Sequence, residues 1–278
     1  MNMQGTRTKD RDPDLADFYK PPVVETLLSV QFEKLTAMQA VHLGLFGRKM
    51  QDSFPTTKED FPIPPVIEQF SEGSPQGVRV QFQAMETPGV PRILLFNTAG
   101  TELIQVQNDR FIKNWRQPNA QHEYPHYDPV VKPAFERDFQ KFQDFLAQEK
   151  LGPLKINQCE VTYVNHVVSG VGWRELGDID KIFAFWNELA TPLARPENFD
   201  IRLRFPITDK NNQRIGRLHV EVQPALRATD GRPMYVVNLT ARGQLGSGFE
   251  FFDVGRRWIV RAFEKLTTQN MHLVWEKK

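Results

Sequence analysis

The residues His-Glu-Tyr-Pro-His at positions 122–126 match the H-E-x-x-H motif of zinc proteases. In that motif the two histidines, one helical turn apart, bind zinc, and the glutamate acts as a general base. Pro125 interrupts the turn, at a cost of about 3 kcal/mol in a helix, and it disfavours a helical Tyr124. We therefore predict a loop with neither metal nor cofactor. The alternative is a looser metal site formed by His122, His126 and a carboxylate.

Other motifs of catalysis are weak in this chain. The sequence contains no phosphate-binding loop, dinucleotide fingerprint or serine-hydrolase elbow. Cys159, the single cysteine, could act as a nucleophile with His166 or His219, but it begins an apolar strand, which predicts a buried, inert thiol. The glycine-rich residues 243–248 precede a helix but lack the lysine of a phosphate site, and we interpret them as a loop.

The densest polar cluster falls on two predicted strands of the second half: Arg202, Arg204, His219 and Glu221. His219 and Glu221 are two residues apart in a strand, so they share one face of the sheet. The arginines and the histidine could hold an anion, and His219 with Glu221 could transfer protons. This cluster is the basis of an alternative function, that of a hydrolase or a nucleotide-handling enzyme.

The hydrophobic pattern predicts the elements that must position these residues. Helical spacing appears within 37–54, from Asp128 to Gly152, after Asp178 or Asp180 as far as Leu189, and from Asp253 onward. Residues 271–275 could extend the last helix or form a short strand, and the proline-rich residues 54–70 fit no regular element. Alternation predicts strands at 24–32, 78–85, 92–100, 101–112, 158–168, 198–207, 214–228 and 233–243.

Each half of the chain therefore has the order strand, helix, three strands, helix. We predict an α+β fold built from a duplicated unit, with antiparallel sheets that carry helices on one face. The expected boundaries are a disordered tail over residues 1–19, a first unit over 20–152 and a second over 153–278. The two sheets could join edge to edge or form separate domains.

If helices cover one face, alternate strand residues form the other face, and they are polar. The face needs either water or a partner, and a groove for a peptide, a protein or a small ligand is the functional interpretation. Its expected members are Gln31, Arg79, Gln81, Gln83, Gln105, Gln107, Glu160, Arg202, Arg204, His219, Glu221, Gln223, Asn238 and Arg242.

Composition limits the possible partners. Lys+Arg total 35 and Asp+Glu total 34, so the charge gives no argument for nucleic-acid binding, although a local basic patch is not excluded. No apolar run is long enough to span a membrane, and the charged N-terminal residues do not form a secretory signal. With one cysteine, these features predict a cytoplasmic protein.

Short motifs also show a family resemblance. The chain resembles a family of bacterial proteins of about this length that are sporadically distributed among genomes and have no established activity. Such a distribution is typical of horizontally transferred genes, as in defence, toxin–antitoxin or mobile-element systems, and the favoured context is defence or toxin neutralisation. The matching positions are Pro22, Glu25, Phe111, Asn114, Trp115, Arg116, Tyr124, Pro125, Tyr127, Glu160, Tyr163 and Asn165.

The favoured hypothesis is a non-catalytic binding protein with a protein partner. Its binding surface would be the polar sheet face or the loop at 113–128. In that loop Asn114 and Arg116 are the stronger candidates for contact with a partner, unless they satisfy backbone groups of the loop. Glu25 could pair with Arg116 or with Arg79 across the sheet. Tyr124 and Tyr127 are expected to pack the loop onto the sheet and are weaker candidates. The sequence leaves the oligomeric state open.

Overall fold

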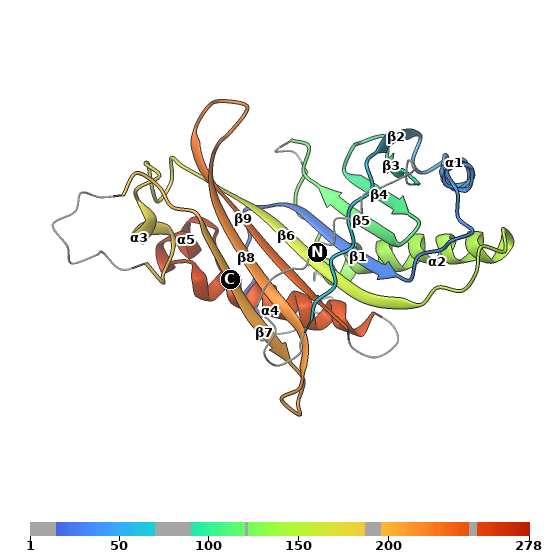
Figure 1. Cartoon of the computed structure of the whole chain (residues 1–278). Helices are drawn as coiled ribbons and strands as arrows, with labels where there is room; N and C mark the ends of the chain where they lie inside the picture. The colour runs from blue at the N-terminus through green and yellow to red at the C-terminus, as the bar shows by residue number, and fades with distance from the viewer. Residues whose placement is uncertain (1–14, 70–89, 120–121, 187–195, 245–248) are drawn as a thin grey trace, which may run out of the picture.

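The computed structural model describes residues 15–69, 90–119, 122–186, 196–244 and 249–278. The strands form one antiparallel sheet in the order β2-β3-β4-β5-β1-β6-β9-β8-β7 (Figure 1). The strands are β1 (Val23–Phe32), β2 (Thr56–Asp60), β3 (Arg92–Phe96), β4 (Glu102–Gln107), β5 (Arg110–Arg116), β6 (Ile156–Val168), β7 (Ile201–Thr208), β8 (Arg214–Leu226) and β9 (Pro233–Gly243). The helices are α1 (Ala40–Lys49), α2 (Lys132–Gln148), α3 (Ile179–Ile182), α4 (Glu250–Leu266) and α5 (Gln269–Val274), with a π-helical turn, η1 (Tyr127–Val131), before α2.

The predicted α+β class is confirmed, and the sheet is continuous. The first strand of each half, β1 and β6, pair in the middle of the sheet, so both halves of the chain contribute to it. In each half the first strand also pairs with the last strand of the meander that follows it. Duplication, and the boundaries of the two units, stay predictions.

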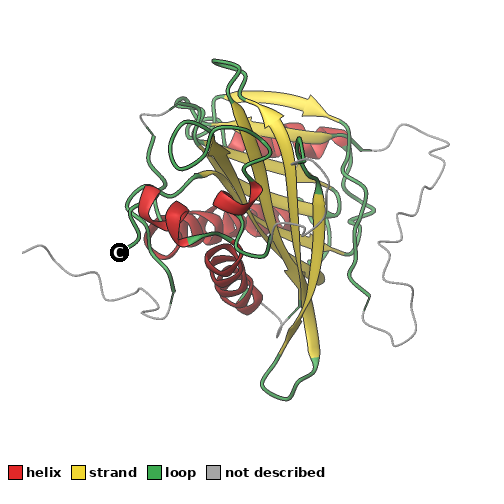
Figure 2. Cartoon of the chain, turned by 90° about the vertical axis from the view of Figure 1, so that its left-hand side faces the viewer, coloured by secondary structure: helices red, strands yellow, loops and turns green. Residues whose placement is uncertain are grey.

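Both long helices lie on the same face of the sheet. Val30 of β1 is opposite Phe111 of β5 and Cys159 of β6, which places these three side chains on one face. Phe111 contacts the phenylalanines of α2, whereas Val161, two residues beyond Cys159, lies against Gly255 of α4. Figure 2, which views the sheet from its side, shows the helices gathered on this face.

Several sequence predictions of elements are wrong. Residues 101–112 are not one strand but part of a hairpin that turns at Asn108 and Asp109. The exposed strand β2 lies in the stretch for which no regular element was expected. The predicted helix after Asp178 ends at Ile182, because Phe183 becomes extended and pairs with Thr267. Residues 271–275 belong mostly to a separate short helix, α5.

Two further expectations concern segments that are described only in part. Phe18, placed in the expected disordered tail, is buried against Phe263 and Trp275, so residues 15–19 belong to the fold. The predicted strand at 78–85, Leu189, and most of the glycine-rich loop at 243–248 lie outside the described residues. Among the described residues, no helix is long and apolar enough to cross a membrane.

Candidate functional site

A segment of the chain itself covers the polar sheet face. We call residues 61–69, Phe-Pro-Ile-Pro-Pro-Val-Ile-Glu-Gln, the covering segment. It follows β2 and crosses the sheet from β4 to β8. Its three prolines favour an extended backbone and leave few N–H groups. Such a segment cannot join the sheet as a regular strand, so side chains of the sheet must satisfy its peptide groups.

Three glutamines hold this backbone, one from each of three strands. Gln107 of β4 binds both peptide groups of Ile63, with N···O distances of 2.9 Å for each bond. Gln31 of β1 does the same for Val66, at 2.9 and 3.3 Å. Gln158 of β6 donates to the Val66 carbonyl at 2.7 Å and accepts from the Glu68 N–H at 2.9 Å.

The glutamines belong to one row across the sheet. Gln107 is opposite Arg110, and Gln31 is opposite both Arg110 and Gln158. Arg110 bridges the row: its Nη2 donates to Gln31 Oε1 at 2.6 Å and to the Pro64 carbonyl at 3.1 Å. Burial lowers the pKa of Arg110, while the carboxylates of Glu160 and Asp109 oppose that shift. The row recognises main-chain groups, so most of its contacts are independent of the segment's side chains.

Glu68 provides the one charged anchor of the covering segment. Its carboxylate accepts hydrogen bonds from Arg217 and, at 2.5 Å, from His219 Nε2, and its side chain is 3% exposed. Arg242 lies nearby and is paired with Glu160. Burial acts to raise the pKa of Glu68, but the hydrogen bond from His219 and the charges of His219, Arg217 and Arg242 outweigh it and lower that pKa.

We expect the attachment of Glu68 to depend on pH. Because the folded-state pKa lies below the ordinary 4.5, the carboxylate stabilises the fold fully above that pH and loses its contribution as the pH falls through the folded pKa. Glu68→Gln should therefore lower the free energy of unfolding by about 2 kcal/mol at neutral pH. This deficit should shrink towards zero in acid. Urea unfolding across this pH range tests it, with the exposed Glu59→Gln as the control; a deficit that is constant with pH would contradict it.

The sheet brings the predicted four-residue cluster together. Arg202 is directly opposite Glu221, and Arg204 is directly opposite His219, on the pair β7 and β8. The two arginines are exposed, whereas His219 is 7% exposed because the covering segment lies on it. His219 contacts Glu68, a residue that the sequence reasoning did not connect with this cluster.

The other predicted site residues lie near the loop at 113–128. Asn114 is buried and donates to Glu25 Oε1 at 2.6 Å, whereas Arg116 is exposed and directly opposite Glu25. Tyr124 packs edge-on against Trp115, and its hydroxyl is 2.7 Å from that of Tyr163. Tyr127 is buried and donates to Asp253 at 3.0 Å. The tyrosines therefore pack this loop against the sheet and α4, as expected.

The loop at 122–126 and Cys159 have the local structures that the sequence predicts. Residues 122–126 are not helical, which confirms the predicted loop; His122 contacts Asn119, whereas the His126 ring packs beside Tyr124. Cys159 is buried as predicted, and burial raises its pKa to about 12. Among the described residues, no group of three or more His, Cys, Asp or Glu could hold a metal ion.

The covering segment was missed because no local pattern marks it. Its partners on β1, β4, β5, β6 and β8 are between 35 and 151 residues away along the chain, and its proline-rich sequence has no period. The one available signal was the polar face itself, whose glutamines required a hydrogen-bonding partner. Comparisons with protein-family models, with curated proteins and with solved structures find no match.

Proposed function

We propose that this protein is a non-catalytic binding protein whose polar sheet face holds an extended segment of a partner protein. The observation that carries the proposal is the row of glutamines, which binds both the N–H and the C=O of single residues in the covering segment. Recognition of an extended backbone, with one side-chain anchor for specificity, is a common way to bind peptides. The covering segment occupies this face within the chain, as a partner segment of similar chemistry would.

The preferred partner segment has a defined chemistry. It is extended, contains prolines so that few N–H groups need satisfaction, and has a carboxylate two residues after the residue held by Gln31. Arg217 and His219 receive that carboxylate. The defence or toxin-neutralising context implied by the family resemblance stays a prediction, and it adds no residue to this site.

Binding of a peptide in trans tests the proposal. In an opened variant, a flexible Gly-Ser sequence of equal length replaces residues 61–69. We expect the synthetic peptide of residues 61–69 to bind the opened variant, and to bind the natural chain more weakly because the chain's own covering segment competes for the face. A peptide with glutamine in place of the glutamate should bind at least about 30-fold more weakly, since it leaves a buried charge unpaired. Isothermal titration calorimetry measures both affinities.

Matched variants locate the binding face. Gln107→Ala in the opened variant removes two hydrogen bonds to the peptide and should weaken binding by about tenfold. Gln223→Ala changes a glutamine on the same face that contacts Asp200 instead, and it should leave the affinity unchanged. If a correctly folded opened variant does not bind the peptide, or if both alanine variants behave alike, the polar face is not a peptide site.

A further inference from the structure

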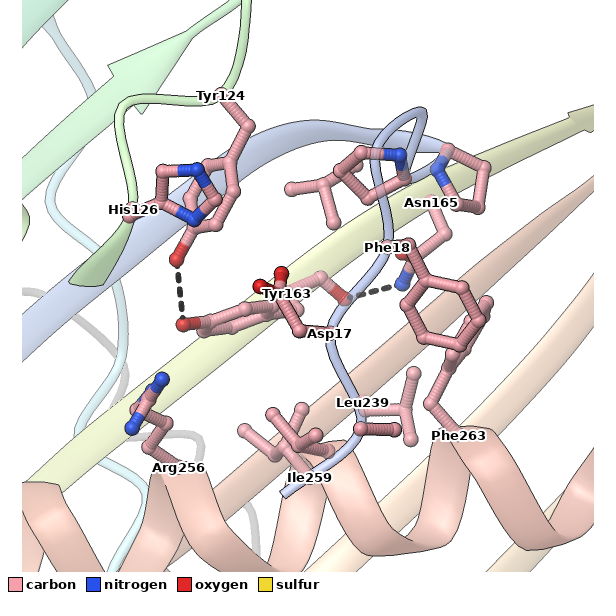
Figure 3. A pocket seen from close by; sticks show the side chains of 15 residues that line it. Asp17, Phe18, Tyr124, His126, Tyr163, Asn165, Leu239, Arg256, Ile259 and Phe263 are labelled. Carbon is pink, nitrogen blue, oxygen red and sulfur yellow. Dashed lines mark hydrogen bonds between the residues drawn. The ribbon is translucent and has the colours of Figure 1, made fainter. Parts of the chain in front are cut away.

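A small cavity lies on the helix-covered face, between α4 and the middle of the sheet (Figure 3). Tyr163 and Asn165 of β6 and Arg256 of α4 supply polar groups, and Tyr124 closes one side. The apolar wall is formed by Phe18, Leu239, Ile259, Val260 and Phe263. Because the covering segment lies on the opposite face, the cavity is independent of the proposed peptide site.

Tyr124 and Tyr163 together have one spare phenol proton, which is not used in the hydrogen bond between them. The hydroxyl oxygens of Tyr124 and Tyr163 are 2.7 Å apart, and Arg256 also lines the cavity. Each phenol carries one proton, and only one of the two protons can lie between the two oxygens. Arg256 has no acceptor to offer the other. Within the part of the chain that the structure describes, that second phenol proton has no acceptor, so it is available to an oxygen atom in the cavity.

The charges around the cavity favour an anionic oxygen. Burial lowers the pKa of Arg256, but the surrounding tyrosines and Asp128 outweigh it and raise that pKa, so the guanidinium stays charged. Asp128 forms an ion pair with Arg256, with 3.2 Å between Oδ2 and Nη1, and Asp17, which also lines the cavity, is paired with Lys278 at 2.8 Å. Both carboxylates thus have a cationic partner, and Arg256 has further N–H groups, which a carboxylate can bind.

The size of the cavity limits the ligand to a short chain. Its volume is about 80 Å³. A single buried water requires a cavity of about 10–15 Å³. This cavity therefore has room for roughly five to eight groups of the size of a water molecule. A carboxylate with three or four carbon atoms fits this volume, and its alkyl chain would displace water from the apolar wall.

We propose that this cavity binds a short-chain monocarboxylate of the size of butanoate. The carboxylate accepts from the spare phenol proton and from Arg256, and the alkyl chain lies against Leu239, Ile259 and Phe263. His126, at the rim, has φ 64° and ψ 149°, a backbone conformation that is rare outside glycine and that often occurs beside ligands. The geometry thus assigns the ligand class from hydrogen bonding, charge and volume together.

Methyl NMR spectra of the full chain test the proposal. Titration of the isoleucine-labelled protein with sodium butanoate should shift the Ile259 methyl signals, with a Kd of about 1 mM for so small a ligand. Ile104, buried in β4, is the internal control and should not shift. Butanamide and butan-1-ol, which lack the negative charge, should bind at least about tenfold more weakly.

A pair of tyrosine variants tests the role of the phenol. The double variant Tyr124→Phe/Tyr163→Phe should weaken the binding of butanoate by about tenfold, because it removes both hydroxyls and with them the spare phenol proton. Tyr235→Phe is the matched control, since its buried hydroxyl donates to the Leu176 carbonyl elsewhere, and it should leave the Kd unchanged. Absence of an Ile259 shift at about 10 mM butanoate overturns the proposal. Equal affinity for butanamide overturns it as well, and this comparison requires no variant.

Discussion

Replacing Phe135 by alanine should lower the free energy of unfolding by about 3–5 kcal/mol, the usual cost of a large cavity in an aromatic core. Phe135 is fully buried on α2, and its ring centroid lies 5.8 Å from that of Phe111 on β5. On its other side it contacts Phe249 and Phe252 of the second half, at 5.3 and 4.9 Å. The substitution therefore removes contacts that join the two halves of the chain.

The same experiment tests whether the two halves unfold together. The pairing of β1 with β6 and the cluster around Phe135 predict a single urea transition, in which the fluorescence of the tryptophans and the far-ultraviolet circular dichroism change at the same midpoint. The control is Phe61→Ala, since Phe61 is 87% exposed and should change the stability by less than about 0.5 kcal/mol. Two transitions, of which Phe135→Ala shifts only one, would show that residues 20–152 and 153–278 are independent domains.

The polar face was predictable from sequence because strand alternation is a local property. Gln31, Gln105, Gln107, Glu160 and Arg242 alternate with apolar residues, and the described members of the predicted set lie on one face. Strand alternation does not reveal which segment of the chain packs on that face. Gln31 and Gln107 are 4% and 2% exposed, not solvated, because the covering segment approaches from a part of the chain without periodicity.

The buried side of α1 was hard to predict for a similar physical reason. In α1, Val41 and Leu45 fit the helical spacing of apolar residues in the sequence, but they are 61% and 47% exposed. The buried side of the helix contains Leu43, Phe46 and Gly47, and the missing side chain of Gly47 lets Leu95 of β3 approach the helix. When a helix has apolar residues on more than one side, its sequence does not define a unique buried face. The contact with β3 in the folded protein then determines which side of α1 is buried.

The hairpin between β4 and β5 was missed for a different reason. Both strands are almost entirely buried although both contain polar residues, so the polar residues of the turn do not stand out from those of the strands. Asn108 and Asp109, which favour turns, were the available signal. The cavity beside Tyr163 had no signal of its own, because its lining comes from five separate parts of the chain.

The second large effect is expected at the buried ion pair between Lys113 of β5 and Asp138 of α2. Their side chains are 4% and 1% exposed, and the Nζ–Oδ2 distance is 2.7 Å. Glu102 also binds Lys113, and the half-exposed Arg137 and Lys141 lie near Asp138. Lys113→Met or Asp138→Leu alone leaves a buried charge without its main partner, and each should cost about 3 kcal/mol of stability.

The double variant Lys113→Met/Asp138→Leu should regain most of this loss, because two apolar side chains of similar size replace two charges that were costly to bury. Urea unfolding of the four proteins gives the coupling energy, which should be at least about 1 kcal/mol. The matched control is the exposed pair of Glu33 and Lys155, 3.2 Å apart, whose cycle should give less than about 0.5 kcal/mol. If the two buried substitutions are additive, Lys113 and Asp138 do not act as a pair. Glu102 would then stabilise Lys113, and Arg137 and Lys141 would stabilise Asp138, independently of each other.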